Sequence, residues 1–118
     1  MSENNMIRRF PASAPGRSRV VIHDGRVFTV ATAREKTPSL RAQTESALAM
    51  LDRHLAEAGT DKSKLLSATV YITDMKRKAE MNDAWMAWVD QANAPQRACI
   101  GAVLDGDDLI EIVAVAAL

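Results

Sequence analysis

The chain has 118 residues, of which 47% are apolar and 25% are charged, as expected for one globular domain with a single core. Fifteen basic and fifteen acidic side chains give a formal net charge of zero, which argues against a nucleic acid or a membrane surface as partner. The single cysteine excludes an internal disulfide. Together with the lack of an apolar leader in residues 1–15 and of an apolar run of about 18 residues, this indicates a cytoplasmic protein.

The N-terminal part of the chain predicts a lead-in followed by a β-hairpin. Residues 1–16 hold two prolines among polar side chains, and we expect them to be extended. The β-rich runs 19–23 and 27–31 follow, separated by Asp24-Gly25 and its flanks. An Asp-Gly pair between such runs is typical of a tight hairpin, because both turn positions take a positive φ.

A long helix is predicted next. The triplet Thr37-Pro38-Ser39 is typical of a helix start, since Thr can cap the helix and Pro fits its first turn. Apolar residues then recur at helical spacing, while His54 lies off their stripe, and Gly59 is the expected stop. The stripe consists of Leu40, Ala47, Leu48, Leu51, Leu55 and Ala58.

A strand and a second helix follow. The run 65–73 is apolar and β-branched, which predicts a strand. A strand, a long helix and a strand imply a right-handed crossover if the strands are parallel. The second helix is expected over about 76–92 and to end before Pro95. Its apolar face consists of Met81, Trp85, Trp88 and Val89, a pattern typical of core packing.

The C-terminal part predicts two strands, 97–104 and 109–118, joined as a hairpin by Asp105-Gly106-Asp107-Asp108. The element order is then ββαβαββ. This order indicates an α+β fold in which a single mixed sheet carries two helices on one face.

Both faces of the last two strands are apolar, yet two helices can cover only one side of the sheet. We expect Arg97, Cys99 and Glu111 on the uncovered face, because side chains alternate along a strand. The opposite, covered face would hold Ala98, Ile100, Ala102, Leu104, Ile110, Ile112, Ala114 and Ala116. Soluble monomers avoid such an exposed apolar face, so we expect it to pack against another subunit in a closed cyclic oligomer.

Charged groups in a buried interface are costly unless they are paired or functional. Arg97 and Glu111 could form an ion pair between subunits, and Arg97 could also be exposed at the start of its strand. Neither structural alternative requires a catalytic site.

At these residues the sequence resembles the RidA (Rid/YjgF) family across roughly residues 18–117. Four blocks match in order, and together they are far more specific than any one alone. They are LLSATVYITDM (65–75), AEMNDAWMAWV (79–89), APQRACI (94–100), which is similar to the family signature Pro-x-Arg-x-Cys, and LIEIVAVAAL (109–118). The helix block 42–66 also fits.

This resemblance implies a chorismate-mutase-like α+β fold and a homotrimer with three clefts between subunits. It implies hydrolysis of reactive enamines and imines, such as 2-aminoacrylate, to 2-keto acids and ammonia, with no metal or organic cofactor. By the same resemblance Arg97 binds the substrate carboxylate, Glu111 positions water and Cys99 lies in the cleft. Ser18 keeps a family serine, and Asn82 matches a family position that helix capping explains equally well.

The sequence also departs from the family pattern. Arg17 stands where the family commonly has a tyrosine, and Val30-Ala31-Thr32 replaces a Ser-Gly-Gln segment. The loop before the first helix is short, and Val113 replaces a second glutamate. These changes reshape one wall of the expected cleft and leave the substrate open.

The residues themselves suit imine hydrolysis. An arginine fork matches a carboxylate in a bidentate manner, and Glu111 could orient or deprotonate water for attack on the imine carbon. Cys99 is not needed as a nucleophile. Two other functions remain possible on these residues: a non-catalytic module that holds a small carboxylate, and a ribonuclease or translation inhibitor. Zero net charge and few aromatics argue against the last.

Overall fold

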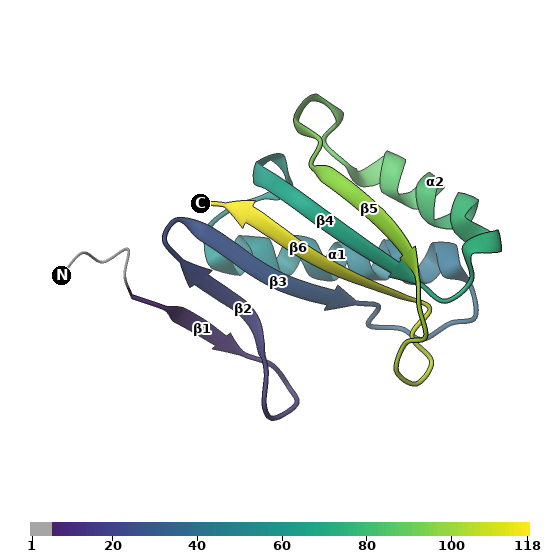
Figure 1. The fold of residues 1–118 in the computed structure, drawn as a ribbon, viewed down its shortest axis with the longest axis horizontal. Helices are drawn as coiled ribbons and strands as arrows, with labels where there is room; N and C mark the ends of the chain where they lie inside the picture. Colours follow the sequence, from purple (N-terminus) through teal and green to yellow (C-terminus); the bar gives the residue numbers. More distant parts are fainter. Residues whose placement is uncertain (1–5) are drawn as a thin grey trace.

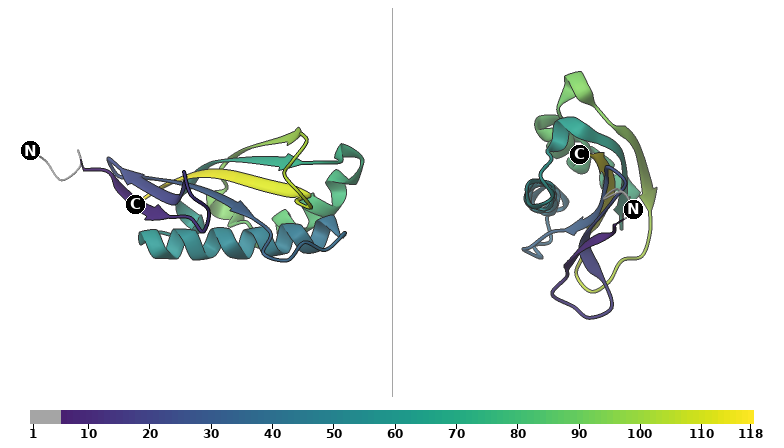
Figure 2. Two further views of the ribbon diagram at one scale, coloured as in Figure 1. Left: turned by 90° about the horizontal axis from the view of Figure 1, so that it is seen from below. Right: turned by 90° about the vertical axis from the view of Figure 1, so that its left-hand side faces the viewer.

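The computed structural model describes residues 6–118, which form one six-stranded sheet with both α-helices on the same face (Figures 1 and 2). The sheet order is β1-β2-β3-β6-β4-β5, which confirms the predicted α+β class with a single mixed sheet. The strands are β1 (Arg8–Pro11), β2 (Ser18–His23), β3 (Arg26–Thr32), β4 (Leu65–Ile72), β5 (Gln96–Gly101) and β6 (Ile110–Ala117). The helices are α1 (Leu40–Ala58) and α2 (Lys78–Trp88), with 3-10 turns at Lys62–Lys64, Met75–Arg77 and Gln91–Asn93.

The hairpin between β2 and β3 is confirmed. His23 pairs with Arg26, and the two residues between them have φ values of 52° and 75°, which Asp and Gly adopt at low cost. The antiparallel pairing ends at the pair Val20–Thr29. Beyond it the first residues of β2 are not paired with the last residues of β3, and this end of the hairpin is where a recess opens.

Helix α1 begins after Ser39, whose hydroxyl accepts a hydrogen bond from the backbone N–H of Ala42 at 3.1 Å. Ser39 is therefore the cap, and Thr37 lies outside the helix. Gly59 ends the helix at φ 87°, as predicted. The side chains of Leu48, Leu51 and Leu55 are fully buried against the sheet.

Helix α2 is shorter than predicted and does not extend to Pro95. Its last residue is Trp88, after which Val89 is extended. The side chain of Asp90 accepts the backbone N–H of Ala92 at 3.1 Å and starts a separate 3-10 turn. This local hydrogen bond competes with continuation of the helix.

The predicted C-terminal hairpin is wrong, because β5 and β6 are not neighbours. Strand β4 lies between them and pairs with β5 in parallel and with β6 antiparallel. The parallel pair is joined through α2, which places β5 at the edge of the sheet. Residues 102–109 then pass β4, so that β6 inserts between β3 and β4. The apolar sequence of β6 suits this central position.

The lead-in contains a strand that the sequence pattern did not predict. Residues 1–5 lie outside the described part, but Arg8–Pro11 forms the edge strand β1 and pairs antiparallel with β2. The guanidinium of Arg19 ties this strand to α1, because it donates to the carbonyl of Pro11 and to the carboxylate of Glu57. The contact with α1 is tertiary and could not be inferred from the local sequence.

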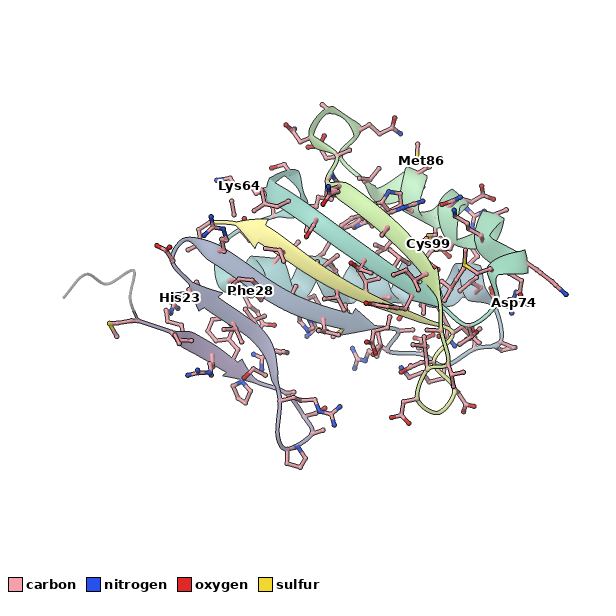
Figure 3. The ribbon with its side chains drawn as sticks, in the orientation of Figure 1. His23, Phe28, Lys64, Asp74, Met86 and Cys99 are labelled. Atoms are coloured by element: carbon pink, nitrogen blue, oxygen red, sulfur yellow. The ribbon has the colours of Figure 1, made fainter. Side chains whose placement is uncertain are left out.

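The face of the sheet opposite the helices is apolar and uncovered, as expected. Figure 3 looks onto this face, on which Phe28 and Val30 are exposed. Ile100 is exposed on it as well, so its predicted place on the covered face is wrong. Val113 and Val115 of β6 are half-buried on the same side, while Ile110, Ile112, Ala114 and Ala116 are buried under the helices.

Candidate functional site

The Arg97 side chain lies on the helix-covered side of the edge strand β5 and is half-buried. Its guanidinium carbon lies 5.4 Å from the centroid of the Trp85 ring of α2. Its Nη1 lies 4.0 Å from Sδ of Met81, to which it can donate a weak hydrogen bond. The ion pairs within residues 6–118 do not include Arg97. A guanidinium held against an aromatic ring and a thioether, without an anion, is free to bind one.

Cys99 and Asn82 belong to the same side of the sheet. Cys99 follows Arg97 by two residues, and its Sγ lies 4.0 Å from Sδ of Met75 (Figure 3). Asn82 follows Met81 on α2, and its Oδ1 is buried with no hydrogen-bond partner among the described residues. A buried carbonyl oxygen without a partner is costly. Arg97 and the Asn82 oxygen are thus two separate polar groups on the helix side that have no strong polar partner among residues 6–118.

Glu111 lies on the opposite, open face. It pairs in register with Thr32 of β3 and Tyr71 of β4, whereas the adjacent Ile112 is buried beneath the helices. Its side chain lines a recess of about 650 Å³ at the end of the hairpin where β2 and β3 separate. Arg17 and Ser18 line the same recess.

The prediction that Arg97, Cys99 and Glu111 share one face is therefore wrong. Arg97 and Cys99 are in register with Ala68 and Val70 of β4, which are buried under the helices. Across β4, Arg97 is level with Ala114, three residues along β6 from Glu111. Two strand spacings of about 4.8 Å and three residues of about 3.3 Å put the two backbones roughly 14 Å apart, and their side chains point to opposite sides. Alternation along β5 shows which side chains share a face, but it does not show which of the two faces the helices cover. The register with β4 decides that. The candidate residues thus form two separate groups, Arg97 with Cys99 on the helix side and Glu111 with Arg17 and Ser18 at the recess.

Comparison with known proteins identifies the relatives of this fold. The family model described as Endoribonuclease L-PSP matches residues 9–118. A RutC family protein of Haemophilus ducreyi is 40% identical over 103 residues, which cover 86% of this chain and 88% of that protein. The RutC family protein YoaB of Escherichia coli K12 is 34% identical over 102 residues, covering 86% and 90%. The chain belongs to the Rid/YjgF family.

A solved Rid/YjgF structure supports the same conclusion. The YjgF-family protein NMB1025 of Neisseria meningitidis superposes with a TM-score of 0.92 at 36% identity, over 98% of this chain and 97% of that one. The family model and the relatives carry different descriptions. Membership of the Rid/YjgF family therefore establishes ancestry and fold, but the names of the relatives do not agree on one reaction.

Within this Rid/YjgF chain, the recess beside Glu111 has walls of opposite charge. The segment 11–19 supplies Arg17 and Arg19, and the loop 105–111 supplies Asp105, Asp108 and Glu111. Arg19 is bound to Glu57, with Nε 3.1 Å from Oε2, and this hydrogen bond holds the pKa of the Glu57 carboxyl below its usual range. Asp108 is paired with Lys36.

His54 is the functional candidate that sequence reasoning missed. It was expected off the apolar stripe of α1, but its side chain is only 6% exposed and it lines the recess. The Thr29 hydroxyl donates its proton to the carbonyl of Arg19 at 2.7 Å, so Nδ1 of His54, 3.0 Å away, must donate to Thr29. Burial is the largest cause that lowers the pKa of the imidazole. Its spacing could have revealed this position. His54 is three residues after Leu51 and four before Ala58, which places it on the same face of the helix as these apolar residues.

Among residues 6–118, three or more His, Cys, Asp or Glu side chains do not gather into a group able to hold a metal ion. In the same range, neither helix is long and apolar enough to cross a membrane.

Proposed function

We propose that this chain is a cytoplasmic hydrolase that converts reactive enamines and 2-imino acids, of the 2-aminoacrylate type, into 2-keto acids and ammonia. The observation that carries the proposal is the half-buried guanidinium of Arg97, which lies against Trp85 and Met81 without an anionic partner among the described residues. A carboxylate-bearing substrate supplies the missing anion.

The proposed reaction consumes one water and releases one ammonia. Arg97 binds the carboxylate through two parallel hydrogen bonds and so places the adjacent imine carbon. Glu111 accepts a proton from water as its oxygen bonds to that carbon, which gives a carbinolamine. Protonated Glu111 then returns its proton to the nitrogen. The carbon–nitrogen bond breaks as the hydroxyl forms the carbonyl and gives its proton to Glu111 or water, which releases ammonia and a 2-keto acid. Cys99 would line the cleft near Arg97 without forming a bond to substrate.

The positions of Arg97 and Glu111 require a site shared between copies of the chain. The two residues point to opposite sides of the sheet, so a single protomer cannot direct both at one small molecule. We propose that the open face, where Phe28, Val30 and Ile100 are exposed, packs against other copies in a homotrimer. Each cleft then receives Arg97 from one subunit and Glu111 from its neighbour.

The test is hydrolysis of imines released from a panel of amino acids by an amino-acid oxidase, with semicarbazide as a competing trap. We expect the wild-type chain to accelerate keto-acid release and Arg97→Ala to abolish most of that acceleration. Losing a bidentate charged contact costs on the order of 2–4 kcal/mol, or roughly thirty- to a thousandfold in kcat/KM. Arg97→Lys should rescue poorly, because a point charge lacks the fork.

A matched control is Arg41→Ala, since Arg41 is exposed on α1 and its Nη1 lies 3.9 Å from Asp83. It should retain full activity. Normal hydrolysis by a correctly assembled Arg97→Ala variant would remove the carboxylate role of Arg97.

A non-catalytic module that holds a small carboxylate is the alternative. Arg17, Val30 and Thr32 line the recess beside Glu111 at positions where the sequence departs from the family, and this favours changed chemistry in the cleft. Binding of a 2-keto acid that depends on Arg97, without accelerated hydrolysis of any imine, would support it. The name of the matching family model points to RNA cleavage, but a net charge of zero gives little attraction for phosphates.

A further inference from the structure

Arg17 is a basic residue of the recess that the proposed reaction does not use. It makes no ion pair within residues 6–118, whereas Arg19 is bound to Glu57 and Asp108 to Lys36. Among the described residues that line the recess, Arg17, Asp105 and Glu111 are the charged groups outside these ion pairs.

The backbone at Arg17 is held in place, although its side chain is exposed. The Arg17 carbonyl accepts the backbone N–H of Ala12 at 3.3 Å. The next residue, Ser18, pairs with Pro11 of β1. Gly16, at φ 82°, adopts the left-handed conformation in the turn directly before Arg17, and Arg17 lines the recess. A long arginine on such a base can extend over a ligand and offer several donors. The hydroxyl of Ser18 adds another donor on the same wall.

The two walls fit the two ends of one ligand. The acidic loop 105–111 suits the cationic nitrogen of a protonated imine, next to the Glu111 that activates water. The basic wall suits an anion farther along the molecule. If Arg97 of another subunit holds the carboxylate beside the imine carbon, that anion belongs to the substrate side chain.

Resting on the proposed function, we infer that Arg17 selects 2-imino acids with a second carboxylate on the side chain, such as the imines of aspartate and glutamate. Its guanidinium, with the Ser18 hydroxyl, receives the distal carboxylate. The volume of about 650 Å³ leaves room for a four- or five-carbon diacid.

The experiment compares kcat/KM for oxidase-generated imines of glutamate, alanine and arginine in the wild type, Arg17→Gln and the control Arg26→Gln. Arg26 is an exposed arginine at the hairpin turn, 3.9 Å from Asp24 and outside the recess. We expect the wild type to prefer the glutamate imine. We expect Arg17→Gln to lower its kcat/KM by roughly tenfold, the order of one charge-assisted hydrogen bond at a partly solvated site. The alanine imine should be unaffected, and Arg26→Gln should match the wild type.

Several results would overturn the inference. An equal loss for alanine and glutamate imines would mean that Arg17 holds the carboxylate beside the imine carbon. A wild-type preference for the arginine imine would assign selection to Asp105. No preference, or a preference that survives in Arg17→Gln, would also refute it.

A binding measurement separates this inference from the proposed function. Calorimetric titration compares 2-oxoglutarate with 2-oxobutanoate on the same variants. If no imine is hydrolysed, but 2-oxoglutarate binds more tightly and loses that advantage in Arg17→Gln, the reaction fails and the diacid selection stands. If the two keto acids bind alike, the diacid selection falls.

Discussion

At the residue scale, His54 links the buried side of α1 to the recess that holds Glu111. Its Nδ1 donates to Thr29, which in turn donates to the Arg19 carbonyl where β2 leaves β3. Burial lowers the pKa of the imidazole, and the nearby Arg19 and Arg53 act in the same direction, while Glu57 and the Val30 carbonyl oppose them. The folded chain therefore holds this histidine neutral under conditions that protonate it in the unfolded chain.

This lowered pKa predicts that the folded chain becomes less stable as the pH is lowered. Below the usual histidine pKa of 6.5 the unfolded chain binds more protons at this residue than the folded chain, so the free energy of unfolding decreases as pH drops. The slope cannot exceed about 1.4 kcal/mol per pH unit for one proton. We expect urea unfolding to show less stability at about pH 5.5 than at about pH 7.5, a range in which carboxylates stay ionised.

The variant His54→Asn should flatten this pH dependence, because its amide can still donate to Thr29 but does not titrate. His23→Asn is the control, since His23 is exposed at the hairpin and should leave the slope of the wild type unchanged. An equally steep pH dependence in His54→Asn would assign the proton uptake to another group.

At the scale of elements, α1 sets the geometry of the recess because it carries both His54 and the Glu57 that binds Arg19. Its N-terminus depends on the Ser39 cap. We expect Ser39→Ala to lower the free energy of unfolding by about 1 kcal/mol, because the Ala42 N–H loses its partner. Ser39→Asp should retain stability, since Asp caps as well and its charge suits the helix N-terminus.

The measurement for this cap is the midpoint of urea unfolding for the two variants and the wild type. A midpoint for Ser39→Ala equal to that of the wild type would show that water replaces the hydroxyl at no cost. Ser39→Ala removes both the serine and the cap, whereas Ser39→Asp removes the serine but keeps a capping side chain. Comparing the two therefore isolates the effect of the cap.

At the scale of the whole molecule, the proposed cleft shared between subunits predicts complementation between inactive variants. Arg97→Ala keeps Glu111, and Glu111→Gln keeps Arg97, so a cleft between unlike subunits can contain both native residues. If subunits mix at random in a cyclic trimer, about one quarter of the clefts are intact, and mixed trimers should recover about that share of wild-type hydrolysis.

Light scattering on each variant provides the assembly control, with a trimer mass expected throughout. Each variant alone should stay inactive. A lack of recovery in demonstrably mixed trimers would refute a shared cleft. If Arg97 and Glu111 instead form only an ion pair between subunits, each single substitution should weaken the trimer, and the double substitution should partly restore it.

The local sequence predicted most of the individual elements. Asp24-Gly25 predicted the hairpin, Gly59 the end of α1, and the apolar runs the strands β2, β3, β4 and β6. These features depend on contacts within a few residues, such as a positive φ or a helical stripe, so a short stretch of sequence contains the required information. The family resemblance, carried by residues such as Arg97 and Cys99, is likewise a property of the sequence and was confirmed by the comparisons.

The tertiary structure alone decided which way Arg97 and Cys99 face, whereas alternation along the last strand already placed Glu111 on the open face. Arg97 and Cys99 turn toward the helices because they are in register with buried residues of β4, and Glu111 turns away because its neighbours Ile110 and Ile112 are buried beneath the helices. The buried position of His54 likewise depends on Thr29 and Arg19, from strands distant in the sequence. The two faces of a strand are nearly equivalent by themselves. The face that becomes covered depends on the register with the neighbouring strands, which alternation along one strand does not specify.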